Sequence, residues 1–125
     1  MRIFKTRWFN KWANKEWLGD EAIRQAVEEL RAGLIDADLG GHVYKKRIAL
    51  PGQGKRGGVR TLLAFKVDER AFFMYGFAKN ERENIAEDEL RALKAYAREL
   101  LGYSEAALEK ALTAKVFFEV NGNER

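Results

Sequence analysis

Three short apolar runs between Gly41 and Ile85 most constrain what this chain can fold into. The first two are separated by PGQGKRGG at 51–58, which offers no apolar side chain and whose glycines lose too much backbone entropy in a regular element. The last two are joined by a short turn at 68–70. Runs of this length bounded by turn residues are typical of strands. The stretch therefore predicts a meander of three antiparallel strands, at residues 43–50, 59–67 and 71–78.

The first of these runs alternates in character. Successive side chains of a strand point to opposite faces. Tyr44, Lys46 and Ile48 are therefore expected on one face, and Lys45 and Arg47 on the other.

Apolar residues at helical spacing flank the strands. Thr6 is expected to cap a first helix that carries Trp8 and Trp12, and Asp20 a second helix that ends near Gly33. These two helices predict a hairpin that packs on the sheet. We interpret the tryptophans as packing residues rather than as a base-stacking platform.

Further elements are expected at both ends of the chain. Residues 2–5 predict a short edge strand and residues 116–120 a strand that pairs at a sheet edge. Asn84, with Glu87 three residues on, resembles a capping box that opens a third helix, and Ser104 is expected to cap a fourth.

The composition restricts the class of protein. A chain of 125 residues is expected to form a single domain spanning 1–125. It has no cysteine and one histidine, which excludes disulfides and thiolate ligands and argues against a zinc site. We find neither a membrane-spanning run nor a signal-peptide core at the start, so we expect a cytoplasmic protein with no membrane partner.

Charge is segregated within the chain. The formal net charge is +4 and the pI about 9.4, yet no Asp or Glu occurs between His42 and Lys66. Such segregation favours a polyanionic partner. The basic residues in this interval are Lys45, Lys46, Arg47, Lys55, Arg56, Arg60 and Lys66.

Several catalytic classes do not fit. GQGKRGG is not a P-loop, because that motif must lead into a helix and Val59 onward is expected to be a strand. His42 is alone, so one chain cannot supply a pair of histidines for acid and base catalysis. Basic side chains at strand ends remain, with Arg60 and Lys79 in matching places. They could bind a phosphate without chemistry, or stabilise the charge that develops when a phosphodiester is attacked.

Several phrases of the sequence resemble one branch of the RelE/HigB-like toxins of type II toxin–antitoxin modules. The phrases are Asp36-Ala-Asp-Leu-Gly-Gly, Lys45-x-Arg47, Pro51-Gly-Gln-Gly-Lys55, Gly57-Gly58-x-Arg60-Thr, Ala71-Phe-Phe and Gly76-Phe-Ala-Lys79-Asn80-Glu81-Arg82-x-Asn84-Ile85.

The resemblance implies an α+β fold with an N-terminal helical hairpin packed on a small twisted antiparallel sheet, followed by C-terminal helices. It also implies a toxin that cuts messenger RNA on the ribosome and is silenced by a cognate antitoxin. Relatives in the wider superfamily inhibit DNA gyrase instead, and a non-catalytic nucleic-acid-binding module is a further alternative.

By the same resemblance, the reaction is attack of a ribose 2′-hydroxyl on the adjacent phosphate, with no metal and no cofactor. The residues expected to take part in catalysis are Arg60, Lys55, Lys79 and Tyr75. The resemblance implies RNA binding by Lys45, Arg47 and Arg82, and the segregation of charge adds their basic neighbours Lys46 and Arg56 as expected RNA-binding residues. The expected partners are the antitoxin, the ribosome and messenger RNA.

Overall fold

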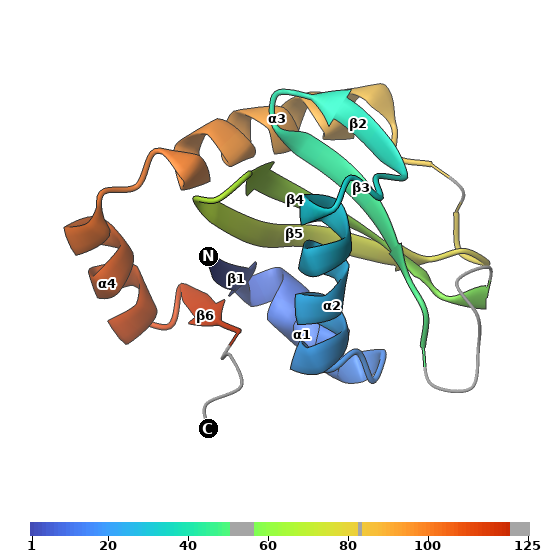
Figure 1. The fold of residues 1–125 in the computed structure, drawn as a ribbon, viewed down its shortest axis with the longest axis horizontal. Coiled ribbons are helices and arrows are strands. Elements are labelled where there is room, and N and C mark those ends of the chain that lie inside the picture. Colours follow the sequence, from blue (N-terminus) through green and yellow to red (C-terminus); the bar gives the residue numbers. More distant parts are fainter. Residues whose placement is uncertain (51–56, 83, 121–125) are drawn as a thin grey trace.

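The computed structural model describes residues 1–50, 57–82 and 84–120. The strands are β1 (Arg2–Thr6), β2 (Ala37–Gly40), β3 (Val43–Ile48), β4 (Val59–Lys66), β5 (Arg70–Ala78) and β6 (Phe117–Glu119). The helices are α1 (Arg7–Lys15), α2 (Asp20–Arg31), α3 (Glu87–Leu101) and α4 (Glu105–Thr113) (Figure 1).

All the described strands belong to one mixed sheet in the order β2-β3-β4-β5-β1-β6. The predicted meander is present, because β4 pairs antiparallel with both β3 and β5. β1 pairs parallel with β5 and antiparallel with β6, which forms an edge of the sheet. The sheet thus mixes both kinds of pairing.

The predicted α+β architecture is wrong in two respects. The chain begins with a strand rather than with a helical hairpin, and the sheet is a large mixed one of six described strands rather than a small antiparallel one. β1 is also an inner strand, not an edge. Its position follows from its side chains: Ile3 packs into the core on one face of the sheet, and Phe4 into the core on the other.

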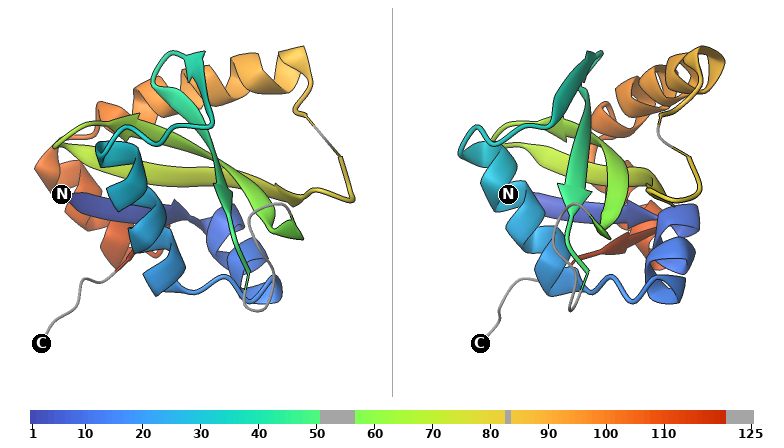
Figure 2. Two further views of the ribbon diagram at one scale, coloured as in Figure 1. Left: turned by 45° about the vertical axis from the view of Figure 1, so that its right-hand side comes forward. Right: turned by 90° about the vertical axis from the view of Figure 1, so that its right-hand side faces the viewer.

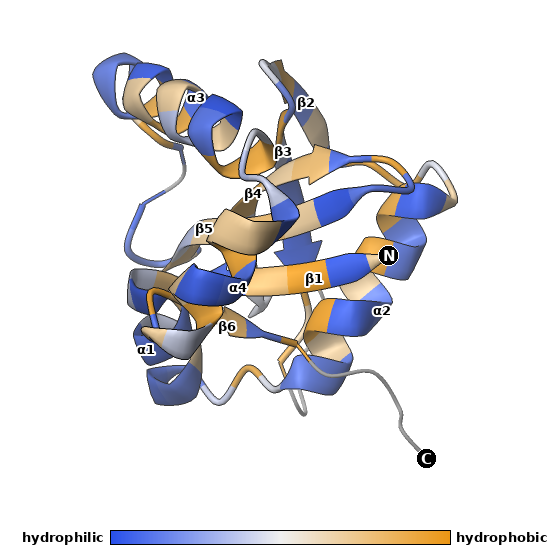
Figure 3. Cartoon of the chain, turned by 90° about the vertical axis from the view of Figure 1, so that its left-hand side faces the viewer, coloured by the Kyte–Doolittle hydropathy of each residue, from blue (hydrophilic) through white to orange (hydrophobic). Residues whose placement is uncertain are grey.

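The two faces of the sheet carry separate hydrophobic cores. Helices α1 and α2 cover one face, where Phe9 and Ile23 join Phe73 of β5. Helices α3 and α4 cover the other, where Leu100 and Leu108 meet strand residues. Figure 2 shows α2 and α3 on opposite sides of the sheet. In Figure 3 the helices carry alternating hydrophilic and hydrophobic bands, as expected of amphipathic helices that cover a sheet.

The helix starts follow the expected chemistry in part. Thr6 and Ser104 are N-caps whose hydroxyl oxygens accept backbone N–H bonds, as predicted. The N-cap of α2 is Gly19, one residue before the predicted Asp20. The N-cap of α3 is Ala86, whose N–H donates to the Glu89 carboxylate at 2.9 Å, so the predicted cap at Asn84 is wrong. No helix in the described ranges is long and apolar enough to cross a membrane.

Candidate functional site

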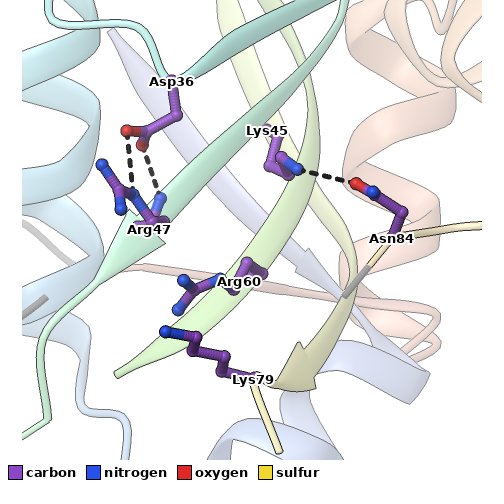
Figure 4. Close-up of a pocket in the computed structure, with 6 residues that line it drawn as sticks. All are labelled: Asp36, Lys45, Arg47, Arg60, Lys79 and Asn84. Carbon is purple, nitrogen blue, oxygen red and sulfur yellow. Dashed lines mark hydrogen bonds and ion pairs between the residues drawn. The ribbon is translucent and has the colours of Figure 1, made fainter. Parts of the chain in front are cut away.

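A basic cleft of about 320 Å³ opens at the end of the sheet where β3, β4 and β5 meet the start of α3. Figure 4 shows side chains from both ends of the 36–84 interval turned into this cleft. The described residues that line it are Asp36, Lys45, Arg47, Arg60, Lys79 and Asn84.

Strand register brings the basic residues to one face. Arg47 lies opposite Arg60 in the β3–β4 pair, and Arg60 lies opposite Phe77 in the β4–β5 pair. Lys45 is two residues before Arg47, so it points to the same face. This is the face that α3 and α4 cover, since Val43 belongs to their core. The predicted alternation along β3 therefore describes the site correctly.

The glycines before Arg60 have a steric reason. A Cβ added to Gly58 would collide with the backbone carbonyl of Ile48 on the neighbouring strand. A glycine at this position therefore lets β4 begin close against the end of β3. β4 begins at Val59, one residue before Arg60, so the Arg60 side chain extends from a backbone that is already paired with β3.

Arg60 is the most unusual residue of the cleft. Its exposed fraction is 9 %, and its Nη1 is buried without a hydrogen-bond partner among the described residues. A buried donor left unsatisfied typically costs about 1–3 kcal/mol, and more when it carries charge. A bound anion in the cleft would remove this cost, so the geometry favours an anionic ligand at Arg60.

Lys79 supplies a second cation to the same place. It follows the last residue of β5, and in Figure 4 its ammonium end lies beside the Arg60 guanidinium. The turn after it is held by Glu81, whose carboxylate accepts the Ala78 N–H at 3.1 Å. Glu81 therefore has a structural role.

Asp36 is the one carboxylate among the described residues that line the cleft. It accepts the backbone N–H of Arg47 at 2.7 Å and the Nε of the same residue at 3.2 Å. The pair orients Arg47 and offsets its charge. Arg60 and Lys79 have no such carboxylate partner in the described part of the chain, so the cleft keeps a net positive charge.

Asn84 holds the Lys45 ammonium, which donates to the side-chain carbonyl oxygen of Asn84 at 3.1 Å. An amide is neutral, so this bond positions Lys45 without cancelling its charge. Sequence reasoning missed Asn84 and Asp36 as site residues. Both lie in the phrases that carry the family resemblance, which was the available signal.

Tyr75 and Arg82 lie outside this cleft on the same face of the sheet. The Tyr75 ring stacks on Trp8 at 4.7 Å, and its hydroxyl accepts a long bond of 3.4 Å from Arg82. Arg82 also pairs with Glu89 of α3 and lies over the Phe77 ring. The Glu89 carboxylate raises the pKa of Arg82, and the Arg82 guanidinium lowers the pKa of Glu89, helped by the Ala86 N–H.

Lys46 points to the other face of the sheet. Its side chain is 3 % exposed, and its ammonium pairs with Glu29 at 2.7 Å and with the carbonyl oxygen of Leu34 at 3.1 Å. The structure thus separates Lys46 from Lys45 and Arg47. Lys55 and Arg56 lie outside the described residues.

Candidate metal ligands do not gather in the described ranges, where no three His, Cys, Asp or Glu side chains are placed to hold a metal ion. The chemistry available in the cleft is that of fixed cations. These can bind a phosphate group and stabilise additional negative charge on it.

Comparison with protein families matches nearly the whole chain. The family described as "RelE toxin of RelE / RelB toxin-antitoxin system" matches residues 1–120. The match includes every described residue of the cleft. The chain therefore belongs to the RelE toxin family, the toxin components of RelE/RelB toxin–antitoxin systems.

Proposed function

We propose that this toxin is a ribosome-dependent endoribonuclease that cuts messenger RNA at the Arg60 cleft. The observation that carries the proposal is the nearly buried guanidinium of Arg60, whose Nη1 has no partner among the described residues. Membership of the RelE family supports the same function. A scissile phosphate would satisfy the buried donor and offset the charge of the cleft.

The proposed reaction uses the message's own hydroxyl as nucleophile. The ribose 2′-oxygen attacks the adjacent phosphorus, and the bond from phosphorus to the 5′-oxygen breaks. The products are a 2′,3′-cyclic phosphate and a free 5′-hydroxyl. DNA lacks the 2′-hydroxyl and would not be cut.

Each cation of the cleft has a role in this scheme. Arg60 holds the non-bridging oxygens, whose charge grows in the transition state. Lys79, beside it in Figure 4, donates a proton to the departing 5′-oxygen. Lys45 and Arg47 grip the flanking backbone, and the 2′-hydroxyl proton passes to water. Tyr75, which lies outside the cleft with its hydroxyl bonded to Arg82, takes no part in the proton transfer in this scheme.

The ribosome enters the proposal as a positioning device. Fixed cations bind any RNA backbone without defining which phosphate is aligned for attack. A message held in a defined path would supply this alignment. We therefore place the toxin in the cytoplasm with the ribosome and messenger RNA as partners, and expect weak cleavage of free RNA. A RelB-type antitoxin is its expected inhibitor.

Primer extension on a defined message tests the proposal. Wild type, Arg60→Ala and Arg60→Lys would be added to a translating extract and, in parallel, to naked RNA. Lys110→Ala is the matched control, because it removes one positive charge from α4, outside the cleft. Thermal melting of each variant checks that it is folded.

We expect cuts within the translated frame by wild type and Lys110→Ala, a loss of at least a hundredfold in Arg60→Ala, and little rescue by Arg60→Lys, which lacks the planar fork. If wild type cuts neither substrate and yet arrests growth when it is expressed in cells, the ribonuclease proposal fails and DNA gyrase becomes the target to test. Equal cleavage by Arg60→Ala would remove Arg60 from the mechanism.

A further inference from the structure

A second basic pocket, of about 360 Å³, lies where the turn between β2 and β3, the end of β4 and the last turns of α3 meet. Its described lining residues are Gly41, His42, Lys66, Lys94, Arg98, Leu101 and Gly102. We call it the distal pocket. The family resemblance and the proposed reaction assign no role to this cluster.

The distal pocket is separate from the Arg60 cleft. β3 and β4 pair from Val43 opposite Ala64 to Ile48 opposite Val59, and the cleft lies toward the second end of this ladder while the distal pocket lies at the first. α3 starts beside the cleft and ends at the distal pocket. Its 15 residues span about 22 Å at 1.5 Å per residue.

The charge of the distal pocket has one sign. Lys66, Lys94 and Arg98 line it together with His42, and no Asp or Glu is found among its described lining residues. Lys66 has a partly exposed partner, Glu69, at 3.6 Å. Basic residues elsewhere in the protein that join two elements, such as Arg70 of β5, form ion pairs with carboxylates.

The backbone at the distal pocket is shaped around Lys94. Gly40, Gly41 and His42 have successive positive φ angles of 88°, 61° and 65°. A Cβ added to Gly41 would lie 3.2 Å from Lys94 Cγ, and one added to Gly40 would lie 3.2 Å from Lys94 Nζ. The left-handed turn thus lies closely against the Lys94 side chain, which restricts where its ammonium can go.

A purely structural role explains only part of this arrangement. A cation in the last turn of a helix is stabilised by the helix dipole. In α3 this cation is Arg98. Lys66 is the last residue of β4 and His42 lies in the turn between β2 and β3, so neither is part of α3 or gains from its dipole. Concentrating the three cations Lys66, Lys94 and Arg98 in one pocket creates repulsion, which a bound anion would relieve.

We propose that the distal pocket binds a second phosphodiester segment of RNA while the Arg60 cleft holds the phosphate to be cut. RNA is named as the ligand on the strength of the proposed function. The segment belongs either to the same message or to ribosomal RNA, and the two sources share the chemistry that the distal pocket recognises. Two phosphate contacts at opposite ends of the β3–β4 ladder would fix the orientation of the toxin, which one cleft cannot do.

The test compares two double variants that remove equal charge. Lys94→Gln with Arg98→Gln changes the distal pocket, and Lys110→Gln with Lys115→Gln is the control in and after α4. Binding would be measured with a 2′-O-methyl tetranucleotide, a 2′-O-methyl 30-mer and empty ribosomes over a series of salt concentrations. The methylated RNA cannot be cut, so binding is read separately from cleavage. Melting temperatures within a few degrees of wild type confirm folding.

We expect the distal-pocket variant to lose about tenfold in affinity for the 30-mer, the ribosome or both, and to bind the tetranucleotide as wild type does. The slope of log affinity against log salt should flatten by about 1.4 on the 30-mer, since each lost contact to a single strand contributes about 0.7. Loss on the 30-mer identifies the message as the source, and loss on the ribosome alone identifies ribosomal RNA.

The proposal would be overturned if the distal-pocket and control variants bound the 30-mer and the ribosome equally well. It would also be overturned if the only defect of the distal-pocket variant were weaker binding of the antitoxin. Failure of this second RNA site can be told apart from failure of the proposed ribonuclease function. If wild type cuts no message but the slope still changes, the RNA site stands and the nuclease does not. If wild type cuts the message but the distal-pocket variant binds both the 30-mer and the ribosome as the control does, the nuclease stands and the RNA site does not.

Discussion

The Lys46 ammonium lies 2.7 Å from a Glu29 carboxylate oxygen, on the opposite face of β3 from Lys45 and Arg47. Glu29 belongs to α2, so the pair joins that helix to the sheet through a side chain that is 3 % exposed. Neighbouring basic residues on one strand therefore have unrelated roles: Lys46 holds the fold, and Lys45 faces the cleft.

We therefore expect alanine substitutions at these two residues to affect different properties, the stability for Lys46 and the RNA binding for Lys45. Lys46→Ala removes one partner of a buried ion pair and should lower the free energy of unfolding by about 2–3 kcal/mol, somewhat below the usual range because Glu29 is partly exposed. Lys45→Ala should change stability by less than about 0.5 kcal/mol and instead weaken RNA binding. Urea denaturation and RNA affinity, measured on both variants, check the prediction. An RNA defect in folded Lys46→Ala as large as that of Lys45→Ala would contradict it.

Substitutions at Gly76 and Trp12 are expected to have coupled effects on stability. A Cβ on Gly76 would collide with the Trp12 ring, which packs across β5 from α1. Gly76→Ala should therefore destabilise the protein by about 1–3 kcal/mol, the cost of overpacking. In the Trp12→Leu background the same change should cost less, because the smaller side chain leaves room. A double-mutant cycle by urea denaturation measures this coupling, and additive effects would contradict the contact.

Local patterns in the sequence predict the centre of the fold. Apolar runs and turn residues place the β3–β4–β5 meander, and alternation along 43–50 assigns Lys45 and Lys46 to opposite faces. Lys46 was included among RNA-binding residues because a count of charges ignores the face to which each residue points.

Long-range pairing explains what local patterns miss. β1 pairs with β5 in the register Arg2 opposite Arg70, so its inner position depends on partners far along the chain. Asp36 and Asn84 are likewise brought to the cleft by tertiary packing. Asn84 has a sequence pattern typical of a helix cap, yet it bonds to Lys45 of β3. The local pattern is insufficient where a side chain has a distant alternative partner.

Arg82 and Glu89 predict a pH dependence of stability. The Arg82 guanidinium lowers the pKa of Glu89 below its ordinary value of 4.5. A carboxyl whose pKa is lower in the folded than in the unfolded state stabilises the fold above the unfolded value. This contribution is lost as the pH falls through the folded value. We therefore expect the stability difference between wild type and Glu89→Gln to be full at pH 6 and to shrink below pH 4.5.

Urea denaturation of wild type and Glu89→Gln between pH 7 and pH 3 measures this difference. The pair is exposed to solvent, so added salt should reduce the effect at every pH. Glu99→Gln, which removes a carboxylate from the same helix but keeps the Arg82–Glu89 pair, is the control. A difference between wild type and Glu89→Gln that stays constant over the whole range would contradict the assignment.

Replacing Arg60 with an apolar residue is expected to stabilise the fold while it abolishes cleavage. Its Nη1 is buried without a partner in the described part of the chain, so Arg60→Met should raise the free energy of unfolding by about 1–2 kcal/mol while abolishing cleavage. Arg47→Met is the control, because Arg47 is paired with Asp36 and should yield no gain. Sulfate, which can occupy a phosphate site, should raise the melting temperature of wild type more than that of Arg60→Met, since a ligand stabilises only the protein that binds it. If Arg60→Met unfolds more readily than wild type, the guanidinium has a partner within the folded chain, and the cleft is not poised for an anion in the way proposed here.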